Sequence, residues 1–284
     1  MELTLGVTLA VLGAGLLHAG WNALLKSAPG GDALLDTATV VAGSSLCALA
    51  AVPFVSIPVA AAWPYIAAST MIHFGYYLTL ARAYEVGDLS FAYPLMRGTA
   101  PLIVAILGIA FLAELPSVSA SLGILLISLG IVSIAFVRHP TIRKHPPAAA
   151  RWAFANAGVI AAYTLVDATG ARASGSPAGY VSWLLFIEGL PFVAWVLARR
   201  GRTALAYAVK GAGRGLVGGA CSFAAYGIVL WAMTRAPVAA VAALRETSVL
   251  FAALIGSFWL KEGFGLPRLA GAVSVVAGIA ALKL

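Results

Sequence analysis

Two arginines, Arg97 and Arg245, lie within long apolar stretches of this 284-residue sequence. An arginine near the centre of a membrane span costs about 2.5–3.5 kcal/mol on insertion scales, so each guanidinium needs a compensating partner. The planar guanidinium can bind a substrate carboxylate or phosphate through two parallel hydrogen bonds. It can equally form a fixed ion pair, for which Asp167, Glu188 and Glu246 are the acidic candidates in or near apolar stretches. Both roles stay open at the level of the sequence.

A group of rings with polar tips lies in the third apolar stretch. His73, Tyr76 and Tyr77 are spaced i, i+3, i+4 and share one helical face, which Tyr84 continues. Such a face suits a cavity that holds an amphipathic solute. The alternatives are a structural hydrogen bond for His73 and a place in the interfacial aromatic belt for Tyr84, which we favour because Tyr84 is near a segment end.

A similar polar face recurs in two other stretches. His18 and Asn22 are four residues apart with Trp21 beside them, and Tyr163 and Asp167 repeat that spacing in the sixth stretch. Hydrogen bonding between packed helices is the alternative to substrate contact. The candidate substrate-binding residues are therefore Trp21, Asn22, His73, Tyr76, Tyr77, Arg97, Tyr163 and Trp183.

Two prolines, Pro94 and Pro101, interrupt the fourth stretch and free the carbonyls of Ser90 and Arg97. A kinked helix with spare carbonyls is a candidate gate. The ninth stretch has no internal proline, so we expect asymmetric gating. Glu188 is also a candidate carrier of a coupling proton. The candidate gating or structural charge residues are Pro94, Pro101, Asp167, Glu188, Arg245 and Glu246.

These residues are set in a sequence that is 62% hydrophobic and only 10% charged, against roughly 25% charged in soluble domains. Since a helix needs about 20 apolar residues to cross a bilayer, the composition predicts an all-α membrane protein with ten transmembrane helices. The expected spans are 3–25, 34–54, 65–84, 89–112, 117–137, 153–171, 178–197, 216–234, 238–260 and 266–282.

The net charge of +8 is concentrated in alternate loops, which argues against a nucleic-acid partner. Thirteen of the 18 Lys and Arg residues, at positions 26, 82, 138, 143, 144, 151, 199, 200, 202, 210, 214, 261 and 268, fall on one side of the expected membrane. The positive-inside rule then predicts that this side is cytoplasmic and that both termini are outside, in a bacterial-type inner membrane.

The sequence also repeats itself at an offset of 148, which pairs Arg97 with Arg245 and Glu114 with Glu262. Over residues 92–131 there are 11 identities in 40 positions. Glycines at 123 and 130 pair with those at 271 and 278, and predict close helix packing, within the chain or at an oligomer contact. Five helices per copy means that the second copy is inverted. We expect a first repeat at 1–137, a basic cytoplasmic linker at 138–150 and a second repeat at 151–284.

The segments from Arg97 to Glu114 and from Arg245 to Glu262, each ending in Leu-x-Glu, resemble the two EamA repeats of the drug/metabolite transporter superfamily. The resemblance implies a ten-helix basket around a central cavity, with a substrate site between the repeats. Bacterial exporters of amino acids, including aromatic ones, are similar in length and layout. Small multidrug transporters have a glutamate midway along the first helix, whereas His18 and Asn22 stand in that region here.

The function expected from these observations is a secondary transporter that exports amino acids or similar small amphipathic metabolites by alternating access. A carrier or importer of another solute is the alternative, and a lipid-modifying membrane enzyme is a weaker one because the 10 acidic residues are scattered. Cys47 and Cys221 have no metal-binding spacing. We expect no catalytic residues, cofactor or metal, a small-molecule substrate, the lipid bilayer as surroundings, and an internal repeat that is consistent with a monomer.

Overall fold

The computed structural model describes residues 2–26, 32–87, 89–136, 146–259 and 266–284. All regular structure in these ranges is helical, as predicted, and six of the helices are long and apolar enough to cross a membrane. The helices are α1 (Leu5–Lys26), α2 (Ala33–Ala51), α3 (Trp63–Val86), α4 (Leu89–Leu112), α5 (Val118–Ala135), α6 (Pro147–Ala173), α7 (Pro177–Lys210), α8 (Ala212–Met233), α9 (Val238–Arg245), α10 (Ser248–Trp259) and α11 (Leu266–Ala281), with short 3₁₀ turns η1 (Val52–Phe54) and η2 (Ala60–Ala62). Most of the expected linker at 138–150 lies outside the described residues, as does Glu262.

The helices overlap all ten expected spans, but the ninth is broken and the seventh is longer than expected. The break between α9 and α10 falls at Glu246 and Thr247. There the backbone N–H of Glu246 donates a hydrogen bond to the carbonyl of Ala243. The hydroxyl of Thr247 donates to the carbonyl of Leu244 at 2.7 Å. These i→i+3 bonds tighten the turn and compete with the α-helical ladder.

The break is therefore in the copy that has no internal proline. The helix α4 stays α-helical from Leu89 to Leu112, with Pro94 and Pro101 inside it. The kink expected in the fourth span is thus not seen, and the discontinuity lies at Glu246 and Thr247 in the ninth span, where side-chain hydrogen bonding competes with the backbone. A gating role for the two prolines stays a prediction.

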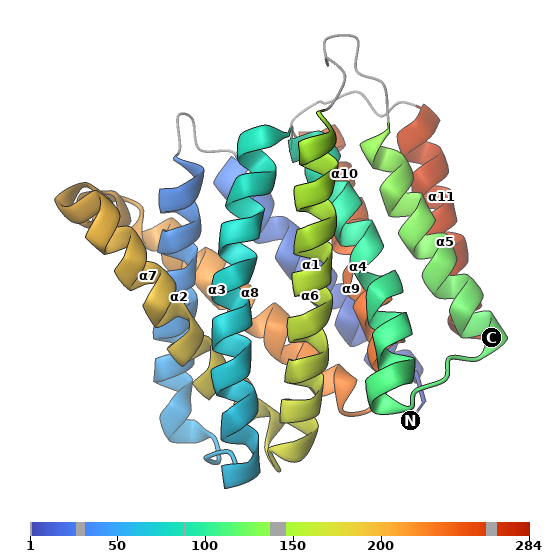
Figure 1. The fold of residues 1–284 in the computed structure, drawn as a ribbon, viewed down its shortest axis with the longest axis horizontal. Coiled ribbons are helices and arrows are strands. Elements are labelled where there is room, and N and C mark those ends of the chain that lie inside the picture. The colour runs from blue at the N-terminus through green and yellow to red at the C-terminus, as the bar shows by residue number, and fades with distance from the viewer. Residues whose placement is uncertain (1, 27–31, 88, 137–145, 260–265) are drawn as a thin grey trace.

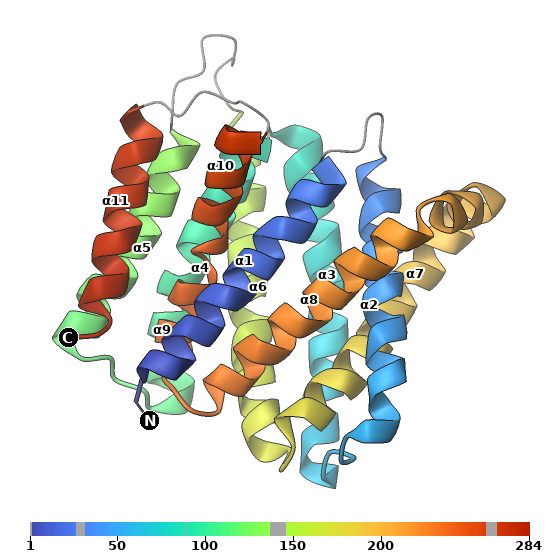
Figure 2. The ribbon, with the colours of Figure 1, turned by 180° about the vertical axis from the view of Figure 1, so that it is seen from behind.

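Both termini lie at the same end of the helix bundle, while α6 begins at the opposite end (Figure 1). In both views α5 and α11 stand side by side at one edge, and α2 and α7 lie at the other (Figures 1 and 2). Between these edges α3 packs on α6, α1 packs on α8, and α4 contacts both α5 and α6.

The helices α5 and α11 are brought together by the glycines that the repeat pairs. A Cβ atom added at Gly123 would lie 2.8 Å from the carbonyl oxygen of Gly278, and one at Gly271 would lie 2.8 Å from that of Gly130. The Ser274 hydroxyl donates to the carbonyl of Leu126 at 2.8 Å. The glycines therefore permit close antiparallel packing within the chain, where the sequence left an oligomer contact open.

Large apolar side chains are exposed on the outward faces of these helices, as expected for a lipid-facing surface. On α4, Ile106 and Ile109 are exposed, as are Leu122 and Leu129 on α5 and Val273 on α11. In water, exposed apolar side chains on so many helices would promote aggregation. In lipid they are well solvated, and the backbone polar groups are satisfied by the hydrogen bonds within each helix. The chain is thus a multi-pass membrane protein whose polar interior is enclosed by its helices.

Candidate functional site

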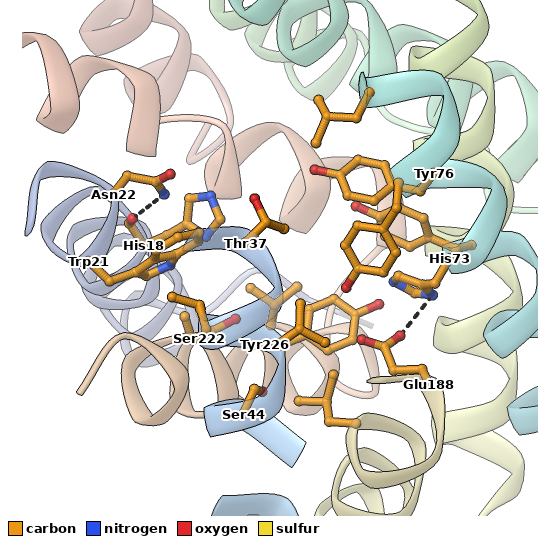
Figure 3. A pocket seen from close by; sticks show the side chains of 18 of the residues that line it. His18, Trp21, Asn22, Thr37, Ser44, His73, Tyr76, Glu188, Ser222 and Tyr226 are labelled. Carbon is orange, nitrogen blue, oxygen red and sulfur yellow. Dashed lines mark hydrogen bonds and ion pairs between the residues drawn. The ribbon is translucent and has the colours of Figure 1, made fainter. Parts of the chain in front are cut away.

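A cavity of about 250 Å³ lies between the helices, and Figure 3 shows Trp21 and Asn22 on the opposite side of it from His73. The positions of its lining residues along the helices place it toward the end of the bundle opposite the termini. Eight of the described helices contribute to its lining. The first four contribute the second half of α1, the first half of α2, the second half of α3 and the first half of α4. The others contribute the middle of α6, α7 and α8 and the end of α9. Most of the predicted substrate-binding residues line it, namely Trp21, Asn22, His73, Tyr76, Tyr77, Arg97 and Tyr163.

One wall of the cavity bears two guanidinium groups that share a single carboxylate. Arg97 Nε lies 2.5 Å from one carboxylate oxygen of Glu246, and Arg245 Nε lies 3.3 Å from the other. Both arginines line the cavity and are 5–7% exposed, while Glu246 is completely buried. Arg97 Nη2 has no hydrogen-bond partner among the described residues. This wall therefore has a net positive charge and, at Arg97 Nη2, a donor that no described residue uses.

The broken ninth span explains how the carboxylate comes to lie there. Glu246 is the residue that follows the last turn of α9, and the chain turns at Thr247 before α10 begins at Ser248. The side chain of Glu246 is thus placed between α4, which carries Arg97, and α9, which carries Arg245. The cation–π contacts of Arg97 with Tyr93 and of Arg245 with Tyr163, both at 5.9 Å, hold the guanidinium planes further.

An acidic group faces the cavity from α7. Glu188 Oε2 lies 3.1 Å from His73 Nδ1 but makes no well-directed hydrogen bond among the described residues. The His73 Nδ1 also lies 3.0 Å from the carbonyl of Ser69, which can only accept, so we assign the Nδ1–H tautomer. The imidazole stacks on the ring of Tyr163 at 4.2 Å. The carboxylate of Glu188 is therefore buried, next to a histidine, and open to a cationic ligand.

Asp167 does not line the cavity but lies behind its wall. It is completely buried and accepts hydrogen bonds from the hydroxyl groups of Tyr180, at 3.0 Å, and Tyr226. Tyr226 does line the cavity. Asp167 therefore orients a lining side chain and does not pair with either arginine within hydrogen-bond distance, contrary to one of the sequence alternatives.

Aromatic rings make up much of the remaining lining. Tyr76 and Tyr77 form an edge-to-face pair at 5.4 Å, and Trp21 pairs similarly with His18 at 5.3 Å. The indole N–H of Trp21 is buried without a hydrogen-bond partner in the described part of the chain. Tyr84 also lines the cavity, although its position near a segment end favoured the interfacial belt. It does so because eleven residues bring the helix back to the face of His73.

The cavity lining differs from the sequence expectations at two aromatic residues. Trp183 is not part of the lining, because its ring packs against Trp63 at 5.3 Å and Phe186 at 6.3 Å. Sequence reasoning also missed Tyr226, which the repeat aligns with Leu78 and therefore did not indicate. The spacing of Ser222 and Tyr226, four residues apart, was the available signal, since both line the cavity.

At the end of the bundle where the termini lie, an ion pair is joined by several hydrogen bonds to the backbone. Arg172 Nη2 lies 2.7 Å from Glu114, and Arg172 Nε donates to the carbonyl of Met233 at 2.8 Å. The second oxygen of Glu114 accepts from the backbone N–H of Val238 at 2.7 Å, where α9 begins. This cluster joins the connection after α4, the end of α6 and the α8–α9 connection on the side where the termini lie.

No group of three or more His, Cys, Asp or Glu residues with metal-binding geometry is found in the described part of the chain. The cysteines Cys47 and Cys221 are both free thiols. The side chains that line the cavity can bind charged and aromatic groups.

Comparison with known proteins gives one family and one fold. Residues 149–284 match the sequence profile of the EamA-like transporter family. A solved structure, titled "Crystal structure of protein", is 19% identical and superposes with a TM-score of 0.74, covering 97% of this chain and 96% of that chain. No curated protein matches the sequence. The likeness to the solved structure shows a shared fold over almost the whole chain.

Proposed function

We propose that this chain, whose residues 149–284 form an EamA-like transporter domain, is a secondary transporter that exports amino acids, including aromatic ones, or similar small amphipathic metabolites. The domain indicates a membrane transporter of the drug/metabolite superfamily, and the charges and rings of the cavity support the proposed substrate class. The observation that carries the proposal is the pairing of a cationic wall, formed by Arg97 and Arg245, with the buried carboxylate of Glu188 in one aromatic cavity.

A zwitterion matches this arrangement of charges. Its carboxylate would bind the guanidinium groups, where Glu246 neutralises only one of two positive charges. Its ammonium would bind Glu188, and its side chain would lie among the rings of Tyr76, Tyr77 and Tyr163. The cavity volume of about 250 Å³ is near the lower end of small-molecule sites, which favours a single metabolite over a large drug.

Contacts between equivalent positions support two inverted repeats, at 1–137 and 151–284. Ser274 is the counterpart of Leu126 at the offset of 148, and the two are joined by a hydrogen bond. A residue can touch its own counterpart only near the axis that relates the copies. At the same offset α8 is the counterpart of α3, and α6 is the counterpart of α1. The contact of α3 with α6 therefore corresponds to the contact of α8 with α1, and both are present. This is the architecture in which one repeat rocks against the other around a central site.

The arrangement of open and closed ends supports alternating access. The cavity lies toward the end opposite the termini, while Glu114 and Arg172 join the two repeats at the other end. With the termini periplasmic, as the positive-inside rule predicts for an inner-membrane protein, the cavity faces the cytoplasm. That is the state in which an exporter loads its substrate.

Counterflow in proteoliposomes tests the proposal. Vesicles loaded with one amino acid should accumulate labelled aromatic and aliphatic amino acids, and Arg245→Gln and Glu188→Gln should each raise KM by tenfold or more. Arg82→Gln is the matched control, because Arg82 is exposed, pairs with Glu85 and is not part of the cavity lining. Accumulation of sugar phosphates with no accumulation of amino acids would refute the substrate. Turnover of a lipid without movement of any solute would refute transport.

A further inference from the structure

The last part of α7 leaves the direction of the helix at Gly201. The helix comprises 34 residues, and Gly201 has φ 52° and ψ −132°, a conformation that side chains with a Cβ atom rarely adopt. The part before Gly201 already provides roughly 36 Å of helix at 1.5 Å per residue, more than the ~30 Å hydrocarbon core. Residues 202–210 therefore lie at the membrane boundary, at the left edge of the bundle in Figure 1.

This short segment is fastened to the beginning of α2. Ala204 is buried in a cluster with Leu35 of α2. The Tyr207 hydroxyl donates to Asp36 at 2.8 Å and accepts from the backbone N–H of Asp32 at 3.3 Å. The segment is thus held to α2 by side chains on one of its faces, and its other faces point away from α2.

The remaining faces are apolar and basic. Leu205 and Val209 are 58% and 69% exposed and lie one turn apart on the same side. The same stretch of sequence, positions 199 to 214, has no acidic residue and contains five exposed cations, Arg199, Arg200, Arg202, Lys210 and Arg214. Arg200 pairs with Asp32 at 3.5 Å and Arg199 lies over the ring of Trp195, whereas Arg202 and Lys210 flank Leu205 and Val209 in the sequence. An apolar ridge flanked by cations is the pattern of a helix that lies in the plane of a membrane surface.

We infer that residues 199–214 form a docking surface for anionic phospholipid. The side chains of Leu205 and Val209 insert among the acyl chains, and the cations bind headgroup phosphates. The occupant is a lipid because the two exposed apolar side chains need hydrocarbon, and because the segment continues a membrane-spanning helix. The inference concerns the membrane placement of α7 and is independent of the solute that the cavity binds.

Native mass spectrometry of the purified, full-length protein titrated with phosphatidylglycerol tests this surface. Each cation near an anionic surface contributes about fivefold in affinity, so Arg202→Gln with Lys210→Gln should weaken binding about 25-fold. Arg235→Gln with Lys283→Gln removes two charges from the opposite end of the bundle and should change little. Circular dichroism checks that each variant is folded.

A second pair of variants keeps the charges and removes the apolar ridge. Leu205→Ser with Val209→Ser should weaken phosphatidylglycerol binding while leaving competition by inorganic phosphate unchanged. An equal loss of phosphatidylglycerol affinity in the Arg202→Gln, Lys210→Gln variant and in the Arg235→Gln, Lys283→Gln variant would overturn the inference. So would phosphatidylcholine that binds as tightly as phosphatidylglycerol, or inorganic phosphate that displaces the lipid completely, since the site would then recognise a free anion.

Discussion

Replacing Glu246 with glutamine should destabilise the protein more than the same replacement of an exposed glutamate. The carboxylate is completely buried and compensates two arginines that are 5–7% exposed. Removing one partner of a buried ion pair costs about 3–5 kcal/mol because an uncompensated charge is left behind. At about 2–4 °C per kcal/mol, the unfolding midpoint in detergent should fall by roughly 6–20 °C.

The assay is thermal unfolding followed by tryptophan fluorescence, with Glu85→Gln as the control. Glu85 pairs with Arg82 at 3.0 Å, but both side chains are more than 60% exposed, so their pair contributes about 0–1 kcal/mol. The double variant Arg97→Gln with Glu246→Gln restores the charge balance of the site and should recover part of the loss, a coupling of about 0.5–3 kcal/mol. A Glu246→Gln midpoint within 1 °C of the Glu85→Gln midpoint would refute the reasoning.

Three further outcomes follow from the contacts. Gly130→Leu should lower stability by about 1–3 kcal/mol in the same unfolding assay, since a Cβ there meets a carbonyl oxygen of α11 at 2.8 Å. Glu114→Gln should speed thiol labelling of an Ala236→Cys reporter in a cysteine-free background, because it weakens the ion pair that closes this end; unchanged labelling would exclude a gating role. Trp21→Phe should raise the counterflow KM for an aromatic substrate about three- to tenfold by removing an unpaired cavity donor, whereas Trp183→Phe should not, since its ring is outside the lining.

Membrane architecture was predictable because lipid imposes strong constraints on the sequence. Each span requires about 20 apolar residues, so hydropathy located the apolar helices, although it missed the extension of α7 beyond position 197 and the break in the ninth span. The break at Glu246 and Thr247 was not predictable, because it depends on a side-chain hydrogen bond. The Thr247 hydroxyl donates to the carbonyl of Leu244, which in a continuous helix would accept only from a backbone N–H. The kink of α7 likewise depends on one glycine in an otherwise regular stretch.

The cavity residues were predictable where helical spacing alone brought polar groups to one face. His73, Tyr76 and Tyr77 were found in this way, and they line the cavity together. Trp183 lies outside the lining, because the sequence position of a single aromatic residue does not tell which way its side chain points from the helix. Tyr226 was missed because its orientation is determined by Asp167, a contact across two helices.

The shared carboxylate shows how a duplicated sequence can produce a cavity with unequal halves. The offset of 148 that pairs the two arginines pairs Glu246 with Gly98. A side chain at Gly98 is excluded, because its Cβ would lie 2.6 Å from Val132 and 2.9 Å from the carbonyl of Ser128 on α5. The first repeat therefore cannot supply an acid of its own, and Glu246 must serve both guanidinium groups. One positive charge remains uncompensated in the cavity, and that surplus is what an anionic group of the substrate would neutralise.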